Sequence, residues 1–433
     1  MSGPYRLTTV RLVESATVVF LLFLLSSALI GPLLDPRQLG GDTNPVLRLM
    51  WLPAYGLIFA VSLLRTPQMA RFWKPAFLLA LLVGLAFAST QWSIDPATSM
   101  RRSVAVAFTT LFGVYLAASY SGRALAELMA LMFAVLALGS FAVAVAVPSL
   151  GVHADVNAGA WKGLWYEKNQ MGAIMVYGVI CALAAAITTP RRRLLWAGTI
   201  VLFIFLILMS RSKTSLLSVM LVLGGAAGLA VVGRGAATAV LAVWAGTMAA
   251  MAFGGMMWLA PDTLFELLGK DPSLTGRTDI WEAVLRQSEK SPTLGFGFAA
   301  FWGLQSAPAE WVRDNTGWLV PTAHNGWLDL LVQLGSVGVT AMAVVLSLAT
   351  LAAILRFRVL GDGYWSILYL AVFLLQSASE SFLLQHNSLA WVFACVAICR
   401  VLGPTPEPYV EEASVRRPLR ASLAPQHASP SWV

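Results

Sequence analysis

Residues 261–323 read PDTLFELLGKDPSLTGRTDIWEAVLRQSEKSPTLGFGFAAFWGLQSAPAEWVRDNTGWLVPTA. This stretch carries charges of both signs and several Gly and Pro breaks, whereas long apolar runs joined by short loops make up most of the remaining chain. A loop of this length in a compact chain is usually functional or disordered. Its Trp, Phe and Ile residues argue against disorder. We therefore interpret the rest of the chain as a scaffold that holds this loop against a lipid surface.

The composition indicates a membrane protein. Of the 433 residues, 58% are hydrophobic and 12% are charged, whereas soluble domains have roughly 25% charged residues. The net charge of +8 comes from basic residues scattered over loop ends, so we expect no nucleic-acid partner. Three cysteines inside apolar runs give no disulfide framework. Four widely separated histidines give no ligand spacing, so we expect no metal and no cofactor.

The apolar runs predict an all-α polytopic membrane protein, because about 20 apolar residues span a bilayer as a helix. Twelve runs meet this measure: 14–34, 46–64, 75–91, 103–120, 124–147, 170–189, 194–210, 214–232, 236–260, 325–355, 365–383 and 388–403. The predicted organisation has four parts: helices 1–9 in 1–260, a large periplasmic loop with an amphipathic helix in 261–323, helices 10–12 in 324–403, and a disordered cytoplasmic tail in 404–433.

The orientation follows from Lys and Arg in the short loops. With the N-terminus inside, the inner segments hold twice as many of these residues as the outer loops. Both termini are therefore predicted to be cytoplasmic, and the long loop to lie outside, which in a bacterium is the periplasmic face of the inner membrane. The first apolar run has no clean cleavage site, so we expect a retained helix.

The basic residues that break this orientation rule form a candidate site. They gather at the outer face where even-numbered helices begin: Arg48, Arg101, Arg102, Lys168, Arg211 and Lys213, followed by His324 and His386. A cation at a helix N-terminus is mildly unfavourable by itself. It becomes sensible when an anion is held there by free N–H groups and cations together. For any single residue, snorkelling into the headgroups is the alternative; for the set, we favour an anion site.

The sharpest short motif is SRSKTS at 210–215. Two cations, Arg211 and Lys213, and four hydroxyls within one turn suit a phosphate or diphosphate. Thr214 or Ser215 is expected to cap the next helix. The alternative is a polar turn between two spans.

The start of the sixth helix combines Glu167, Lys168 and Asn169 with two Trp residues and a Tyr. Such a mixture suits stacking on sugar rings and binding of sugar hydroxyls. The alternative is the aromatic belt at the membrane interface.

Within the long loop, TGRTDIWE at 275–282 predicts a helix start with a capping-box-like pair, Asp279 and Glu282. The apolar stripe that includes Trp281 is interpreted as packing. Arg277, expected just ahead of the cap, would add a guanidinium to this helix end. A surface arginine is the alternative.

His324 and Asn325 open the tenth helix at the outer face, and one of them is expected near its cap. The charged form of a histidine is disfavoured at a helix N-terminus, so the neutral ring can accept a proton near pH 7. A lone histidine is more often structural, which is the alternative for His324.

Glu380 is a buried carboxylate expected inside the eleventh span. An ionisable residue within the membrane is by default a functional candidate. Hydrogen bonds to Gln376, Ser377 or Ser381 across helices are an equal alternative, and the sequence leaves this choice open.

These candidate groups face outside, where ATP and nucleotide sugars are absent. A reaction there needs a donor that carries its own activated bond and arrives through the membrane. A lipid-linked diphosphate meets both needs, and its charge matches the cationic helix ends.

Six runs, in order, resemble the O-antigen ligase/polymerase superfamily: WSIDPATSMRRS at 92–103, WYEKNQMG at 165–172, SRSKTSLL at 210–217, GKDPSLTGRTDIW at 269–281, PTLGFGF at 292–298 and AHNGWLDLLVQLG at 323–335. These sequence motifs are similar to those of the superfamily's Wzy-type exopolysaccharide-production polymerases, of the succinoglycan type. The resemblance implies a GT-C-like, metal-independent, inverting glycosyltransferase of the inner membrane. Its substrates would be undecaprenyl-diphosphate-linked oligosaccharides.

The resemblance also implies roles for residues. Arg211 and Arg277 match two arginines proposed to hold the diphosphate, and His324 matches a histidine proposed to activate the acceptor hydroxyl. Lys213, Lys168, Arg102 and Arg101 are carried over as further substrate-binding residues, together with Glu167, Asn169 and Asn325. Membrane lipids, a chain-length regulator and a flippase are the other candidate partners.

Two rival functions remain open at this point. An O-antigen ligase would use the same chemistry to move a finished chain to lipid A–core. A transporter has a similar number of spans, but it would place ionisable groups near mid-membrane on broken, repeat-related helices. Only Glu380 is a clear deep candidate and no inverted repeat is evident, so the transporter is the distant alternative.

Overall fold

A computed structural model describes residues 4–34, 45–154, 157–235, 277–317, 319–356 and 363–404, with isolated positions 238, 240, 246 and 248. The described residues are predominantly helical, and their one β-bridge joins Val152 to Trp161. All-helical architecture is expected in lipid, because a helix satisfies every backbone hydrogen bond within its own segment. The prediction of an all-α fold is confirmed.

The helices of the transmembrane body are α1 (Pro4–Leu25), α2 (Ile30–Leu34), α3 (Pro45–Leu64), α4 (Thr66–Ala70), α5 (Trp73–Ala88), α6 (Pro96–Ser119), α7 (Gly122–Ala146), α8 (Pro148–Gly151), α9 (Lys168–Thr188), α10 (Arg193–Ser210), α11 (Lys213–Val232), α16 (Gly326–Arg356), α17 (Gly363–Ser377) and α18 (Leu389–Leu402). Two short 3-10 helices, η1 (Ser89–Gln91) and η2 (Pro190–Arg192), extend α5 and precede α10.

Seven helices among the described residues are long and apolar enough to cross a membrane, and three more apolar helices are shorter. The chain is therefore a multi-pass membrane protein. The expected span at 236–260 falls almost wholly outside the described residues, as does the tail from 405. The count of twelve spans stays a prediction.

Three of the expected spans are interrupted. The 14–34 run is divided into α1 and α2 by a turn in which Ser27 and Leu29 have positive φ. The indole N–H of Trp165 donates to the carbonyl oxygen of Ser26 at 2.7 Å, and the N–H of Leu29 donates to that of Leu164 at 2.8 Å. Non-helical backbone at membrane depth is tolerated where protein groups satisfy it in this way.

The second interruption lies in α16 at Gly335, where φ is 63° and ψ is −165°. The 292–298 loop lies against this break: Phe296 and Gly297 donate backbone N–H groups to the carbonyl oxygens of Val332 and Gln333. A Cβ at position 335 would collide with the backbone of Thr293. The glycines at 295, 297 and 335 therefore permit a close backbone approach that the sequence motif alone left unexplained.

The third interruption corrects the expected span at 365–383. α17 ends at Ser377, and residues 378–388 form no regular helix. Glu380 thus lies in a connecting segment, not inside a span. The sequence around it, QSASES at 376–381, is polar and is compatible with the end of a helix, whereas the expected span continued to residue 383.

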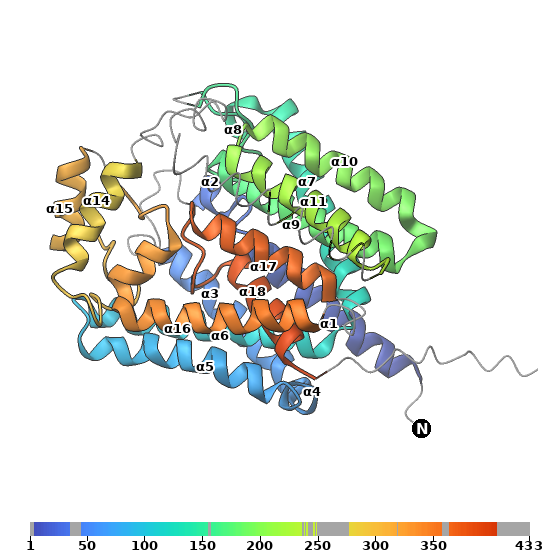
Figure 1. Cartoon of the computed structure of the whole chain (residues 1–433), viewed down its shortest axis with the longest axis horizontal. Helices are drawn as coiled ribbons and strands as arrows, with labels where there is room; N and C mark the ends of the chain where they lie inside the picture. Colours follow the sequence, from blue (N-terminus) through green and yellow to red (C-terminus); the bar gives the residue numbers. More distant parts are fainter. Residues whose placement is uncertain are drawn as a thin grey trace, which may run out of the picture.

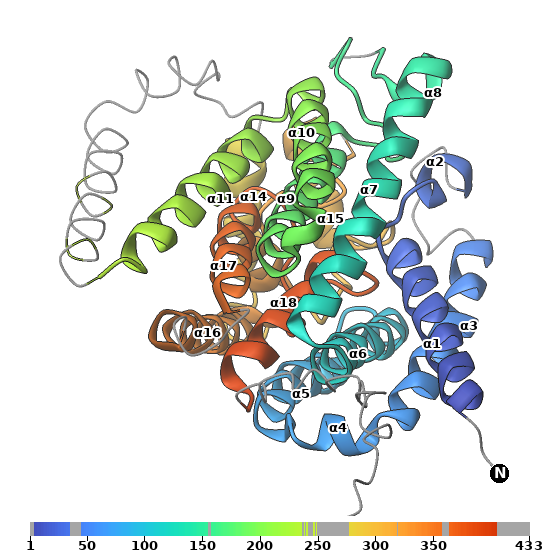
Figure 2. The same ribbon diagram turned by 90° about the vertical axis from the view of Figure 1, so that its right-hand side faces the viewer.

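α9 and α18 form the centre of the bundle (Figure 2). α9 packs against α7, α10, α11 and α17, while α18 packs against α5, α6, α16 and α17. Every residue of α18 from Leu389 to Val401 is buried, as expected for a helix that is apolar on all sides. α10 and α11 instead expose large apolar side chains such as Leu194, Val201 and Met220, which indicates a lipid-facing surface.

Part of the long loop forms a helical lobe at one end of the bundle (Figure 1). It contains α14 (Arg277–Ser288) and α15 (Ala307–Thr316) around a separate apolar core that includes Ile280, Val284, Phe301 and Val312. The start of α1 lies at the opposite end of the body (Figure 1). α14 lies where the sequence predicts a helix in the long loop.

The predicted capping box is wrong, because α14 as described begins at Arg277. Asp279 lies inside the first turn, where its charge favours the positive helix end. Arg277 is already helical, so the expectation that it precedes the cap is corrected as well.

Candidate active site

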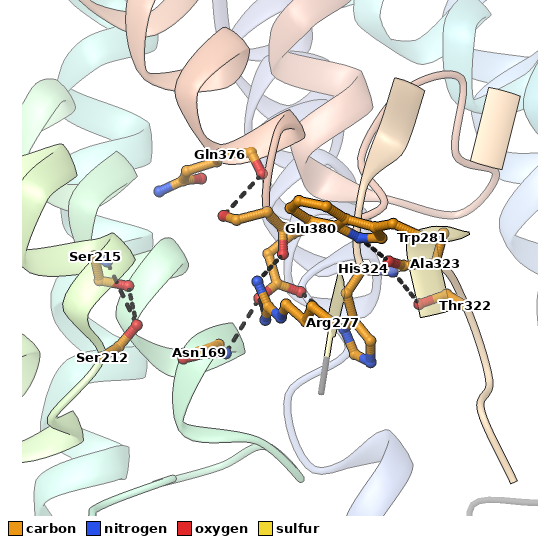
Figure 3. Close-up of polar contacts among 11 residues, drawn as sticks. Asn169, Ser212, Ser215, Arg277, Trp281, Thr322, Ala323, His324, Gln376 and Glu380 are labelled. Atoms are coloured by element: carbon orange, nitrogen blue, oxygen red, sulfur yellow. Dashed lines mark hydrogen bonds and ion pairs between the residues drawn. The ribbon is translucent and has the colours of Figure 1, made fainter. Parts of the chain in front are cut away.

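The Glu380 carboxylate interacts with side chains from three separate parts of the chain. Its Oε1 accepts a hydrogen bond from Asn169 Nδ2 at 3.1 Å and pairs with Arg277 Nη2 at 3.3 Å. Its Oε2 lies 3.8 Å from His324 Nδ1. Figure 3 shows Asn169, Arg277 and His324 gathered around this carboxylate. We call these four residues the Glu380 cluster.

The Glu380 cluster is half-buried, with 18% of the Glu380 side chain and 19% of the Arg277 side chain exposed. A carboxylate removed from water is costly unless it is paired and hydrogen-bonded. Here a guanidinium and an amide supply these partners. The alternative was that Gln376, Ser377 or Ser381 holds the carboxylate, and the observed side-chain contacts differ from it. Gln376 instead accepts the backbone N–H of Glu380 with its carbonyl oxygen, at 2.8 Å.

Arg277 is held at two points. Its Nη1 donates to the carbonyl oxygen of Ser379 at 2.8 Å, and its Nη2 faces Glu380. It therefore bridges α14 of the lobe and the segment that follows α17. The interpretation of Arg277 as a free surface residue is excluded by these contacts.

His324 lies in the turn that leads into α16. Its backbone is left-handed, with φ of 47°, and 29% of its side chain is exposed. Asn325 is the cap of α16: its Oδ1 accepts the N–H groups of Trp327 at 3.0 Å and Leu328 at 3.3 Å. Of the two candidates for the cap, Asn325 is therefore the one, and its side chain is engaged inside the protein.

The first turn of α9 joins the Glu380 cluster to a second group of cations. Lys168 is the first residue of α9, and the preceding Glu167 is exposed and makes no side-chain capping bond. The cap comes from elsewhere, because His153 Nε2 accepts the Lys168 N–H at 3.3 Å. The positive charges of Arg211 and Lys213 also interact electrostatically with the Lys168 ammonium group.

The 210–215 turn differs in part from its prediction. Arg211 ends α10 in the left-handed region, with φ of 51°, and Ser212 caps α11 by accepting the Ser215 N–H. The cap is therefore neither Thr214 nor Ser215. Ser210, Ser212 and Ser215 are buried and hydrogen-bonded within the turn. The expectation that all four hydroxyls face a ligand is wrong for these three.

Arg211 and Lys213 remain exposed on this turn. Arg211 Nη1 donates to the carbonyl oxygen of Ala158 at 3.2 Å. The N-termini of α9 and α11 therefore both carry a lysine as their first residue, beside one exposed arginine. The positive ends of two helices combined with such cations suit an anion.

A cavity of about 720 Å³ lies on another side of α9. Its walls are mainly apolar and come from the end of α1, from α3, α6 and α9, and from residues 382–390. Its polar groups include Arg101, Arg102, Gln170, Gln385 and His386. Arg102 contacts His386 Nε2, and Arg101 donates to Thr98 Oγ1 at 3.1 Å. Desolvation and the charges of Arg102 and Arg101 hold the pKa of His386 well below its usual value, so this ring is neutral near pH 7.

The structure thus divides the predicted site residues into three groups. His324, Arg277 and Asn169 meet at Glu380; Lys168, Arg211 and Lys213 lie around two helix starts; Arg101 and Arg102 line the cavity. The side chain of Arg48 lies outside the described residues. The first turn of α9 and the segment after α17 contribute to both the Glu380 cluster and the cavity wall.

Sequence analysis missed two contributions. His153 caps α9 from 15 residues upstream, and no local pattern marks it. Glu380 and its partners Asn169, Arg277 and His324 were each singled out, but their meeting was not predicted, because these residues come from distant segments of the chain. Among the described residues, no three His, Cys, Asp or Glu side chains are grouped so that they could hold a metal ion.

Comparison with known proteins adds two similarities. A family model described as O-antigen ligase matches residues 198–343, which include Arg211, Arg277 and His324. The exopolysaccharide production protein ExoQ of Rhizobium meliloti (strain 1021) is 28% identical over 209 residues, which cover 45% of this chain and 47% of that protein. The chain therefore matches about half the length of this curated relative. The resemblance found in the sequence is confirmed.

Proposed function

We propose that this chain, a multi-pass membrane protein similar to the O-antigen ligase/polymerase superfamily, polymerises exopolysaccharide. It would transfer a growing chain from undecaprenyl diphosphate to the next lipid-linked repeat unit at the periplasmic face of the inner membrane. The observation that carries this proposal is the Glu380 cluster, in which an imidazole, a guanidinium and an amide from distant segments meet one carboxylate.

In this proposal, His324 is the general base. Its Nδ1 faces Glu380 Oε2 at 3.8 Å, and a nearby carboxylate favours the tautomer that carries its proton on Nδ1. Nε2 is then the basic nitrogen, which takes the proton of the acceptor hydroxyl. The hydroxyl oxygen forms the new bond to the anomeric carbon on the face opposite the diphosphate, so the configuration inverts.

The bond that breaks joins the anomeric carbon to a diphosphate oxygen, which leaves with the electron pair. Arg211 and Arg277 would stabilise the charge that develops there, with Lys168 and Lys213 beside Arg211. Fixed donors that meet charge developing in the transition state are usually the largest catalytic contribution. Asn169 in the first turn of α9, Glu167 just before α9 and Asn325 just before α16 would be further substrate-binding residues.

The apolar cavity next to the cluster would take the part of the isoprenoid chain nearest the diphosphate. Its apolar walls suit hydrocarbon, while Arg101 and Arg102 supply cations at the same wall. A flippase that delivers the lipid-linked units and a chain-length regulator are proposed partners.

The proposed topology puts residues 1–260 and 324–403 in the membrane, the 261–323 loop in the periplasm, and both termini in the cytoplasm. The excess of Lys and Arg in the inner loops supports this orientation. Reporter fusions after residues 193 and 358 should give cytoplasmic signals, and a fusion near residue 290 a periplasmic one. A cytoplasmic signal at residue 290 would contradict both the orientation and the site.

A second candidate is an O-antigen ligase, because the matching family model carries that description. The two functions differ in their products, not in their chemistry. A deletion strain that accumulates single lipid-linked repeat units supports the polymerase. Accumulation of full-length chains that are not attached to lipid A–core supports the ligase.

A further inference from the structure

The backbone of Ala323, the residue before His324, is held from two directions. The N–H of Ala323 donates to Asp329 Oδ1 at 3.0 Å. The carbonyl oxygen of Ala323 accepts the indole N–H of Trp281 at 2.9 Å. Figure 3 shows Trp281 beside Ala323 and His324. Both polar groups of the residue before the proposed base are therefore fixed by side chains.

Asp329 is unusual for its place in the structure. It is 5% exposed, and it borders the lobe's apolar core, which includes Ala323 and Val332. Its Oδ1 accepts a second hydrogen bond, at 2.7 Å, from the indole N–H of Trp302. A carboxylate is buried in apolar surroundings only where such bonds compensate for lost water. Asp329 thus connects the start of α16, the 301–306 turn region and the residue before His324.

Trp281 belongs to the same helix as Arg277. The two residues are four positions apart on α14, so they share one helix face. Arg277 contacts Ser379 and Glu380, whereas Trp281 contacts Ala323. One helix of the lobe therefore holds both sides of the Glu380 cluster, and the interpretation of Trp281 as packing alone is incomplete.

His324 needs such support because its backbone is left-handed, with φ of 47°. A non-glycine residue stays in this region only where the surrounding structure determines it, and such residues collect at functional sites. Asn325, which caps α16, fixes the peptide on the other side of His324.

We infer that Trp281 and Asp329 are positioning residues that hold His324 at its working distance from Glu380. They touch no reacting atom and act through the Ala323 peptide. This inference rests on the proposed function only for the role given to His324; the geometric part stands on the contacts themselves.

The geometric part is tested by the reactivity of His324 toward diethyl pyrocarbonate, which acylates neutral imidazoles. The full-length protein is purified in detergent, and modification at His324 and His386 is followed by peptide mass spectrometry. Trp281→Phe and Asp329→Asn should raise the rate at His324 severalfold and leave the rate at His386 unchanged. Trp311→Phe is the matched control, because it removes an indole from the same lobe. Unchanged rates at His324, or equal increases at both histidines, would overturn the inference.

The functional part is tested by a double-mutant cycle. Trp281→Phe and Asp329→Asn should each lower polymer formed per membrane-inserted protein by about threefold to tenfold, the size expected for one or two lost hydrogen bonds. In a His324→Gln background, the same changes should cost nothing further. A loss that persists in that background would show that the two residues act elsewhere.

The two parts separate the possible failures. If His324→Gln is fully active, the role of His324 as general base is wrong. A faster modification of His324 in Trp281→Phe would still support the positioning role of Trp281. If His324→Gln is inactive and the modification rates do not change, the proposed function stands and the positioning role is wrong.

Discussion

The two groups of cations near the start of α9 are held in opposite ways. Arg277 is half-buried, donates to the Ser379 carbonyl oxygen and pairs with Glu380. Arg211 and Lys213 are exposed, and the Arg211 guanidinium donates to an uncharged carbonyl group. The first arrangement fixes a side chain in place and offsets its charge. The second leaves positive charge facing outward.

This difference suggests a division of work. A guanidinium that is already paired with a carboxylate contributes most through geometry, because its position is set before any ligand arrives. An exposed cation between two helix starts contributes most through its charge, because among the described residues no carboxylate forms an ion pair with Arg211 or Lys213. We therefore expect the Glu380 cluster to fix the positions of the reacting groups, and the exposed cations of the 210–215 turn to supply charge that stabilises the diphosphate.

The largest effect should come from His324. General-base catalysis typically contributes about 10²–10⁴-fold, so His324→Ala should nearly abolish polymer while the protein remains in the membrane. His324→Gln keeps a polar shape without a basic nitrogen and should be almost as poor. Polymer per membrane-inserted protein measures both variants. A purely structural histidine would give the reverse pattern, with glutamine active and alanine scarce.

Arg211 should come next. Removing a donor that stabilises developing charge typically costs about 10²–10³-fold in rate, which is the loss expected for Arg211→Ala. Arg211→Lys keeps the charge but not the two-pronged contact with phosphate, so it should remain clearly impaired. Arg191→Ala, which removes an exposed arginine of η2, is the matched control and should be neutral.

Salt sharpens the contrast between the two arginines. Exposed charges are screened by added salt more than half-buried ones. The defect of Arg211→Ala should therefore shrink as ionic strength rises, whereas that of Arg277→Ala should change little. Equal salt dependence for the two variants would remove the proposed division of work.

Glu380→Gln should have a smaller effect, about ten- to a hundredfold, as expected when hydrogen bonds to a charged group are weakened. The amide keeps an acceptor for Asn169 but no longer pairs with Arg277 or orients His324. Glu127→Gln is the matched control, because this carboxylate pairs with Arg123 and Arg192 on exposed helix surface. Activity per inserted protein should fall only for Glu380→Gln; equal activity would exclude Glu380 from the mechanism.

The smallest effect should come from chelation. The proposed chemistry uses cationic side chains to stabilise the diphosphate, so EDTA should leave the turnover of lipid-linked substrate unchanged. A loss that is restored specifically by Mg²⁺ or Mn²⁺ would count against this mechanism.

Sequence reasoning worked where the signal is local. Helix starts at Lys168, Lys213 and Gly326 could be predicted to within about two residues, because the apolar runs and the polar turns lie next to one another. These predictions place Asn325 and His324 at a helix end, as observed. The same local signals marked Arg211 and Arg277.

The remaining features depend on contacts between distant segments. Glu380 contacts Arg277, which is 103 positions away in the sequence, and Asn169, which is 211 positions away. A single sequence does not show that such distant residues are in contact. The break at Gly335 exists because the 292–298 loop bonds to it. The serines of the 210–215 turn face inward because their hydroxyls serve the turn itself, whereas their sequence spacing is equally compatible with a ligand.

The central claim is that the Glu380 cluster joins lipid-linked sugars directly. The most direct test gives purified protein a single undecaprenyl-diphosphate-linked repeat unit and no other substrate, and follows the products by mass spectrometry. The account predicts a ladder of lipid-linked oligomers, with one undecaprenyl diphosphate released for each bond formed, and no ladder from His324→Gln. A wild-type protein that forms no oligomer, or a His324→Gln protein that forms the same ladder, would contradict it.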